Sequence, residues 1–239
     1  MAATSPALRL WDFASAARVD EFVANSANVQ GRIQRAWGRR SSVVYPPTAV
    51  EDFYWRPASD YFLMVSELVP YKRLDYAIRT ISQMGLPLKI AGQGPEYRRL
   101  KRMAGPTVEF CGRVSDEELR SLYAGARALI APGEEDFGMT MVEALASGKP
   151  VIGLERGGAC EIVGADCGLL YRDGDMGSLQ MALRQFDRMA ESFDPVRLQM
   201  QATNFSAERF DREMRSILNC PPVVDTVMRY AARESRAVE

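Results

Sequence analysis

Short runs of apolar residues recur along most of this chain, separated by stretches in which apolar positions follow a helical spacing. Each run is short enough to be a buried strand, and turn-forming residues bound it. The predicted strands are Tyr61–Val65, Leu88–Ala91, Thr107–Cys111, Ala128–Ala131, Val151–Gly153 and Gly168–Tyr171.

Helix signals fill the intervals between these runs. The apolar spacing across Leu74–Ile81 predicts one amphipathic helix, and Ser115-Asp-Glu-Glu118 is a capping box that would open another. Pro95 stands where a first-turn proline would start a third. Strands and helices that alternate in this way predict an α/β fold, a Rossmann-like parallel sheet with helices on both faces.

The amino-terminal part of the chain follows a different pattern. Short strands are expected at Glu21–Ala24 and Ser42–Tyr45, and Ser26 would cap a helix over Ala27–Trp37 between them. Pro46-Pro47 then interrupts the pattern, which indicates a domain junction. So short a segment cannot form its own core, so we interpret it as the end of another domain.

Three segments follow from this division. A further helix is expected at Phe205–Leu218, with a weaker helical pattern after it. We therefore expect an amino-terminal remnant at residues 1–45, a Rossmann-like domain at 46–219 and a carboxyl-terminal tail at 220–239.

Glycines follow several of the predicted strands. They stand at Gly92-Gln-Gly94, Gly112-Arg113, Glu135–Gly138 and Gly157-Gly158. Ligands of parallel sheets bind at the carboxyl ends of strands, and glycine lets backbone approach them closely. A Rossmann dehydrogenase is the main alternative, but Tyr97 stands where its third glycine belongs, so we favour another kind of nucleotide site.

The most informative stretch runs from Glu135 to Glu143, two glutamates with a glycine turn between them. A helix expected at Met139–Ser147 would leave the amides of Gly138, Met139 and Thr140 free to bind a diphosphate. Carboxylates beside an anion site favour a ligand that also offers hydroxyl groups. Diphosphate with hydroxyls on both sides describes a nucleotide-sugar. Alternatively, Glu135 and Asp136 only complement the helix dipole, and Glu143 is a solvated helix residue.

The amino-acid composition argues against several classes of function. The chain has 239 residues, 47% apolar and 26% charged, and a net charge of −1, so we expect no nucleic-acid partner. Histidine is absent, which excludes histidine general-base catalysis by this chain and the commonest transition-metal ligand. The four cysteines show no Cys-x-x-Cys spacing and are interpreted as free buried thiols. With no signal peptide or membrane-length apolar run, we expect a cytoplasmic protein.

At this point the residues resemble family 4 glycosyltransferases, the retaining enzymes with the GT-B fold, and within them bacterial mannosyltransferases and related enzymes of polysaccharide biosynthesis. The resemblance covers about residues 7–219 and joins several short motifs in order. They are Tyr45-Pro-Pro47, Val65-Ser-Glu-Leu-Val-Pro-Tyr-Lys-Arg73, Gly92-Gln-Gly-Pro-Glu96, Phe110-Cys-Gly-Arg-Val114, Glu135–Glu143 and Gly148-Lys-Pro-Val151 with Gly157-Gly158.

The resemblance implies a transferase that moves a hexose, with mannose as the candidate sugar, from a nucleoside-diphosphate sugar to a glycan or lipid-linked acceptor with retention. Lys72 would neutralise the leaving diphosphate, and Glu135 would face the transferred sugar. No metal or other cofactor would be required. The donor-binding residues implied are Gly92, Gly94, Arg113, Val114, Gly138, Met139, Thr140 and Glu143, with Glu143 on the ribose.

Two departures from the family leave alternatives open. The family commonly has an arginine where this chain has Glu67, and a carboxylate there would repel phosphate unless Arg73 or a rearranged loop compensates; Glu67 could instead orient Lys72. The family's acceptor-binding domain is also largely missing. The alternative is therefore a catalytically silent nucleotide-sugar-binding module, or a half that needs a separate acceptor-domain partner or self-association. A lipid-linked acceptor would place the protein at the inner membrane face.

Overall fold

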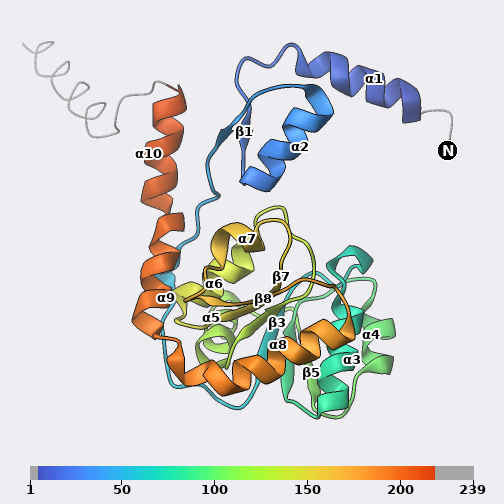
Figure 1. Ribbon diagram of the computed structural model, residues 1–239, viewed down its shortest axis with the longest axis vertical. Coiled ribbons are helices and arrows are strands. Elements are labelled where there is room, and N and C mark those ends of the chain that lie inside the picture. Colours follow the sequence, from blue (N-terminus) through green and yellow to red (C-terminus); the bar gives the residue numbers. More distant parts are fainter. Residues whose placement is uncertain (1–4, 219–239) are drawn as a thin grey trace, which may run out of the picture.

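The computed structural model describes residues 5–218, and the predicted tail at 220–239 lies outside this range. Within it, a six-stranded parallel sheet forms the centre of the larger part of the molecule (Figure 1). The strands are β3 (Phe62–Val65), β4 (Leu88–Ala91), β5 (Val108–Gly112), β6 (Leu129–Ala131), β7 (Val151–Leu154) and β8 (Gly168–Tyr171). Each strand predicted for this sheet is present, with ends displaced by one residue at most.

Helices cover both faces of this sheet, as predicted. On one face α3 packs against α4 and α8, and on the other α6 packs against α5, α7 and α9. Right-handed crossovers place helices on opposite faces when the chain reverses its direction across the sheet. The helices are α3 (Leu74–Met84), α4 (Tyr97–Met103), α5 (Asp116–Gly125), α6 (Met139–Ala146), α7 (Ala159–Ile162), α8 (Met176–Met189), α9 (Pro195–Ala202) and α10 (Ala207–Leu218), with 3-10 turns at Val50–Asp52, Pro70–Lys72, Ala190–Ser192 and Thr203–Phe205.

Two expectations about this part were wrong. Pro95 does not start α4: it lies in a turn, and the helix begins at Tyr97, because the amide of Tyr97 donates to the carbonyl of Gly94. Cys111, Cys160 and Cys167 are free, but they are not uniformly buried, since Cys111 is half-buried and Cys160 is exposed. Cys167 is the buried one of the three described.

The amino-terminal segment forms a small unit of its own. Strands β1 (Val23–Ala24) and β2 (Ser42–Val43) pair in parallel, with α2 (Ala27–Trp37) as the crossover. An unpredicted helix, α1 (Ser5–Ala16), precedes them. Figure 1 shows this unit beyond the edge of the larger part, reached by an extended linker.

The linker after β2 is held by α10 and by the 3-10 turn that precedes it. The guanidinium of Arg209 donates to the carbonyl of Tyr45 at 2.7 Å, and the amide of Thr48 donates to the carbonyl of Phe205 at 2.9 Å. In Figure 1, α10 runs from the sheet domain alongside the linker toward the amino-terminal unit. Segments from both ends of the described chain thus meet beside the sheet. No helix within residues 5–218 is both long and apolar enough to cross a bilayer.

Candidate functional site

The strand order places a crevice at the centre of the sheet. The order is β5-β4-β3-β6-β7-β8, so the chain builds outward from β3 to β5, returns to β6 beside β3, and continues in the other direction. The loops that leave β3 and β6 therefore diverge at their carboxyl ends. In open α/β sheets ligands bind at this reversal point. Lys72 comes from the first of these loops and Glu135 from the second.

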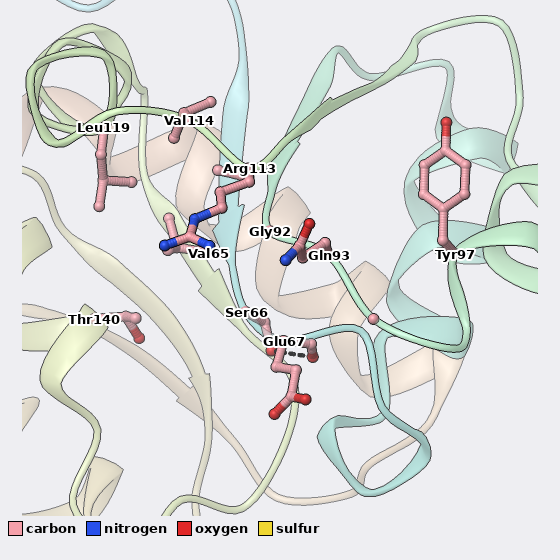
Figure 2. Close-up of a pocket in the computed structure, with 12 residues that line it drawn as sticks. Val65, Ser66, Glu67, Gly92, Gln93, Tyr97, Arg113, Val114, Leu119 and Thr140 are labelled. Carbon is pink, nitrogen blue, oxygen red and sulfur yellow. Dashed lines mark hydrogen bonds between the residues drawn. The ribbon is translucent and has the colours of Figure 1, made fainter.

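A cavity of about 780 Å³ opens at this crevice. Figure 2 shows Arg113 and Val114 on the side of the β5 loop, Thr140 on α6 across from them, and Glu67 at the end of β3. The cavity is lined by Val65, Ser66, Glu67, Ala91, Gly92, Gln93, Gly94, Tyr97, Arg113, Val114, Leu119 and Thr140. Five predicted site residues are in this lining, namely Gly92, Gly94, Arg113, Val114 and Thr140. The lining does not include the predicted residues Lys72, Glu135, Gly138, Met139 and Glu143.

Gly92 shapes the floor of this cavity. Its φ is +135°, and a Cβ there would lie 1.9 Å from the carbonyl oxygen of Ser66. A Cβ on Gly94 would lie 2.5 Å from the carbonyl oxygen of Leu68. The β3 and β4 loops therefore pack backbone against backbone, which side chains at these two positions would prevent. The glycines predicted to allow close approach to the ligand also allow close approach of the two loops.

Lys72 and Glu135 form an ion pair between the two central loops. The Nζ atom of Lys72 lies 2.5 Å from Oε2 of Glu135, and their side chains are 18% and 25% exposed. Gly133 brings the β6 loop against the backbone of Lys72, because a Cβ there would lie 2.8 Å from the Lys72 carbonyl oxygen. The two residues expected to act in catalysis are therefore in direct contact, although they are distant in the sequence.

Glu67 forms an ion pair with neither Arg73, which was expected to compensate it, nor Lys72, which it was expected to orient. Lys72 pairs with Glu135. The guanidinium of Arg73 instead lies 3.8 Å from Asp75, donates to the carbonyl of Gly174 at 3.2 Å and stacks on a tyrosine ring. Arg73 adopts a left-handed conformation, with φ of +54°, which turns its side chain into this separate set of contacts. Within residues 5–218 the exposed Glu67 carboxylate makes no ion pair.

Glu143 is held by a tyrosine that sequence reasoning missed. The hydroxyl of Tyr123 donates to Oε2 of Glu143 at 2.6 Å. Burial raises the pKa of Glu143 above its usual range, while the Tyr123 hydrogen bond opposes that rise. Tyr123 lies on α5 and is fully buried. Nothing in the spacing of the two residues indicated that α5 and α6 would bring them together. Within the described residues Oε1 of Glu143 has no hydrogen-bond partner.

The start of α6 has the features expected of an anion site. Gly138 precedes Met139–Ala146 in a left-handed conformation, with φ of +110°, and no side chain caps the helix. Since a helix leaves its first amides without intrahelical partners, those near Met139 and Thr140 are available to a ligand. Met139 is 46% exposed. Within residues 5–218 there is no cluster of three histidine, cysteine, aspartate or glutamate residues suited to a metal ion.

Comparisons with known proteins agree with this geometry. The model of the family described as "Glycosyl transferases group 1" matches residues 51–193. A GDP-mannose-dependent alpha-mannosyltransferase of Mycolicibacterium smegmatis is 32% identical over 160 residues, which cover 64% of this chain and 41% of that protein. The chain spans less than half the length of the curated relatives it matches.

Solved structures show the same fold. Sucrose-phosphate synthase from Thermosynechococcus elongatus matches with a TM-score of 0.79 at 20% identity, over 88% of this chain and 60% of that one. Alr3699/HepE of Anabaena, solved with UDP-glucose, matches with a TM-score of 0.73 at 20% identity, over 84% of this chain and 64% of that one. Identity this low establishes the fold alone. Because the family model matches more than half of the chain, the expected resemblance is confirmed: this chain belongs to the group 1 glycosyltransferases, and its sheet domain has the architecture of a GT-B half.

Proposed function

We propose that this chain supplies the donor-binding half of a retaining glycosyltransferase, which moves a hexose from a nucleoside-diphosphate sugar to a glycan or lipid-linked acceptor. The observation that carries the proposal is the Lys72–Glu135 pair at the reversal point of the sheet, beside the uncapped start of α6. A cation and free amides suit a diphosphate, and the adjacent carboxylate suits sugar hydroxyls. Mannose is the candidate sugar because one relative is named as GDP-mannose-dependent.

The roles of the site residues follow from the charge that develops during transfer. The leaving nucleoside diphosphate gains negative charge, which Lys72 and the amides of Gly138, Met139 and Thr140 would stabilise. Glu143 has an unpartnered Oε1, which suits the ribose diol. The cavity between Arg113, Val114 and Thr140 has room for the base and ribose. No divalent cation is needed in this scheme.

Donor binding would also change the partner of Lys72. Without ligand, its ammonium neutralises Glu135. A diphosphate beside Lys72 would compete for the ammonium and leave Glu135 free to accept hydrogen bonds from the transferred sugar. The ion pair would thus keep both charged groups satisfied until the donor arrives, and the proposed catalytic pair would separate on binding.

The second candidate is a nucleotide-sugar-binding module without transfer activity of its own. It is favoured by the exposed apolar side chains of α1, which suit burial against another surface. An acceptor-binding partner, or a second copy, would complete the transferase in that case. The two candidates share the donor site and differ in whether transfer is observed.

Calorimetry tests the shared donor site. Wild-type protein should bind GDP-mannose or UDP-glucose, and a chelator should leave the affinity unchanged. Lys72→Ala should weaken binding by roughly tenfold or more, since it removes a charged contact to phosphate. Lys89→Ala is a matched control, because Lys89 pairs with Glu109 away from the cavity. Binding that is lost with the chelator, or absent for every common nucleotide-sugar, would contradict the proposal.

A further inference from the structure

We propose that Glu161 is a positioning residue, which fastens the amino-terminal unit to the loop that carries Glu135. The carboxylate of Glu161 accepts two hydrogen bonds from α2. Its Oε2 accepts from the amide of Ala27 at 2.8 Å, and its Oε1 accepts from the amide of Asn28 at 3.0 Å. Each bond joins residues more than 130 positions apart in the chain. One side chain of the sheet domain thus binds the start of a helix in the other unit.

This contact completes the amino terminus of α2. The hydroxyl of Ser26 accepts from the amide of Val29 at 3.1 Å, which is an ordinary cap. The preceding amides, of Ala27 and Asn28, would remain without partners if Glu161 were absent. The first turn of α2 carries no acidic residue of its own, so Glu161 also supplies the negative charge that favours a helix start. The helix therefore depends on a distant residue at this end.

The helix that carries Glu161 is also connected to the loop that carries Glu135. It lies on the short helix α7, which follows Gly157 and Gly158. The amide of Gly158 donates to the carbonyl of Glu135 at 2.9 Å, and Gly157 forms an isolated parallel bridge with Glu135. A Cβ on Gly158 would lie 1.8 Å from the carbonyl oxygen of Phe137. Movement of α7 would therefore be transmitted to the backbone of Glu135–Phe137.

The amino-terminal unit and the linker also contact this loop directly. Arg32, one turn after Asn28 on α2, forms an ion pair with Asp136. The ring of Tyr45 stacks on Phe137, with centroids 5.6 Å apart. The Arg32–Asp136 pair is more than half exposed on both sides, and such pairs contribute little by themselves. The pair matters because of its position in the loop. Glu135, Asp136 and Phe137 are successive residues, and each is held by a separate contact.

Together these contacts form a support that we call the α2–α7 brace, consisting of Glu161 with Ala27 and Asn28, and Arg32 with Asp136. Figure 1 shows α7 on the side of the sheet domain that faces α2. The brace rests on the proposed function in one respect, namely that Glu135 faces the donor sugar. Its effect is to couple the placement of the amino-terminal unit to the backbone that presents Glu135. The simpler interpretation is that Glu161 is a helix cap with no consequence for the loop.

Amide hydrogen exchange on the full chain without ligand distinguishes these interpretations. In Glu161→Gln, the peptide that contains Ala27 and Asn28 and the peptide that contains Gly158 should both exchange faster, by roughly tenfold or more, because the loss of a charged contact favours local opening. Glu155→Gln is the matched control, since Glu155 is exposed and pairs with Arg172. Faster exchange at Ala27 and Asn28 alone would show a local cap and overturn the brace, as would no change at either place.

A second variant guards against general unfolding. Arg32→Ala alters an exposed pair, so it should leave the melting temperature close to that of the wild type while exchange at Gly158 increases. Unchanged exchange at Gly158 in this variant would contradict the brace. If Glu161→Gln melts far below the wild type, its exchange data cannot separate a local effect from general unfolding. The exchange rate at Gly158 in Arg32→Ala then decides the proposal.

Ligand binding separates this inference from the proposed function. With GDP-mannose and GDP as probes, and UDP-glucose and UDP as a second pair, Glu161→Gln should weaken the sugar conjugate more than the diphosphate, by roughly threefold or more. Equal weakening of both would show that the brace does not reach Glu135. Absence of binding by the wild type would overturn the proposed donor site, and the exchange experiment would still decide the role of Glu161.

Discussion

Single side chains at this site combine a structural cost with a proposed function, and Glu143 is the clearest case. Its carboxylate is largely withdrawn from water, and that burial raises its pKa. The hydroxyl of Tyr123 recovers part of the cost by donating to it. A carboxylate kept in such a position is expected where a ligand needs a strong acceptor, because buried charge is otherwise unfavourable.

The first prediction is that Glu143→Gln raises stability at neutral pH. A raised pKa means that the folded state holds this proton more tightly than the unfolded chain, whose value is about 4.5. The wild type therefore loses stability as pH rises through the raised pKa, and has no such loss below 4.5. Glutamine keeps an acceptor for Tyr123 without the charge, so the melting temperature should exceed the wild type by a few degrees at pH 7 and match it near pH 4. A lower melting temperature at pH 7 would contradict this account.

The second prediction separates the two glutamates by ligand. Glu143→Ala should weaken nucleoside diphosphate and nucleotide-sugar alike, because its proposed partner is the ribose. Glu135→Ala should weaken the nucleotide-sugar more than the diphosphate. Each lost charged hydrogen bond should cost on the order of 1.5–3 kcal/mol, as measured by calorimetry. Equal losses on both ligands for both variants would refute the assignment of roles.

At the scale of elements, the site is made by loops that can pack together only because they carry glycine. The β3 and β4 loops meet at Gly92, and the β6 and β7 loops meet at Gly158, where a Cβ would overlap carbonyl oxygens. The chain places these contacts directly beside the strand ends that form the crevice. Loop packing and ligand access therefore depend on the same residues.

The third prediction is that Gly92→Ala destabilises the fold far more than Gly85→Ala. Gly85 has a φ of +67°, in the left-handed region, where an alanine carries strain of about 1–2 kcal/mol, whereas the φ of +135° at Gly92 lies outside that region. At Gly85 a Cβ would have no neighbour within 4 Å, whereas at Gly92 it would lie 1.9 Å from the Ser66 carbonyl oxygen. Urea unfolding should show a further loss of at least about 2 kcal/mol for Gly92→Ala. Similar losses of unfolding free energy for the two variants would show that the β3 loop moves to make room for the added Cβ.

At the scale of the whole molecule, one face of the amino-terminal unit has no partner among residues 5–218. The pair β1–β2 is two strands with open edges, and such a sheet is marginal unless more structure covers it. Helix α1 exposes Trp11 and Phe13, which are 65% and 57% exposed. We predict that these aromatic side chains are buried against a partner or a second copy of the chain.

The fourth prediction follows from this open arrangement. Transfer requires donor and acceptor to be held together with water excluded, and the described residues form a cavity that is open at the crevice. We expect the purified chain to bind nucleotide-sugar and to show negligible transfer, as measured with a radiolabelled donor. Robust transfer by a demonstrated monomer would contradict this and favour an independent enzyme. Activity that appears only on addition of an acceptor-binding partner would support the donor-half proposal.

The sequence by itself determined the strands of the sheet and their alternation with helices, because these depend on local signals. Apolar runs gave strand positions to within a residue, and the capping pattern at Ser115 gave the start of α5. The glycines and the stretch Glu135–Glu143 marked the ligand edge, and the motifs in order led to the family. Such signals are local, so they do not require knowledge of the packing.

The tertiary structure alone decided which side chains meet. Lys72 contacts Glu135 because β3 and β6 are adjacent, and Glu143 contacts Tyr123 because α5 packs on α6. Glu161 reaches the start of α2 across more than 130 residues. No periodicity or spacing encodes these pairs, since each depends on how separate elements are oriented after the chain has folded. The sequence therefore predicted the sheet edge where a ligand would bind, and packing determined the contacts on which the proposed chemistry depends.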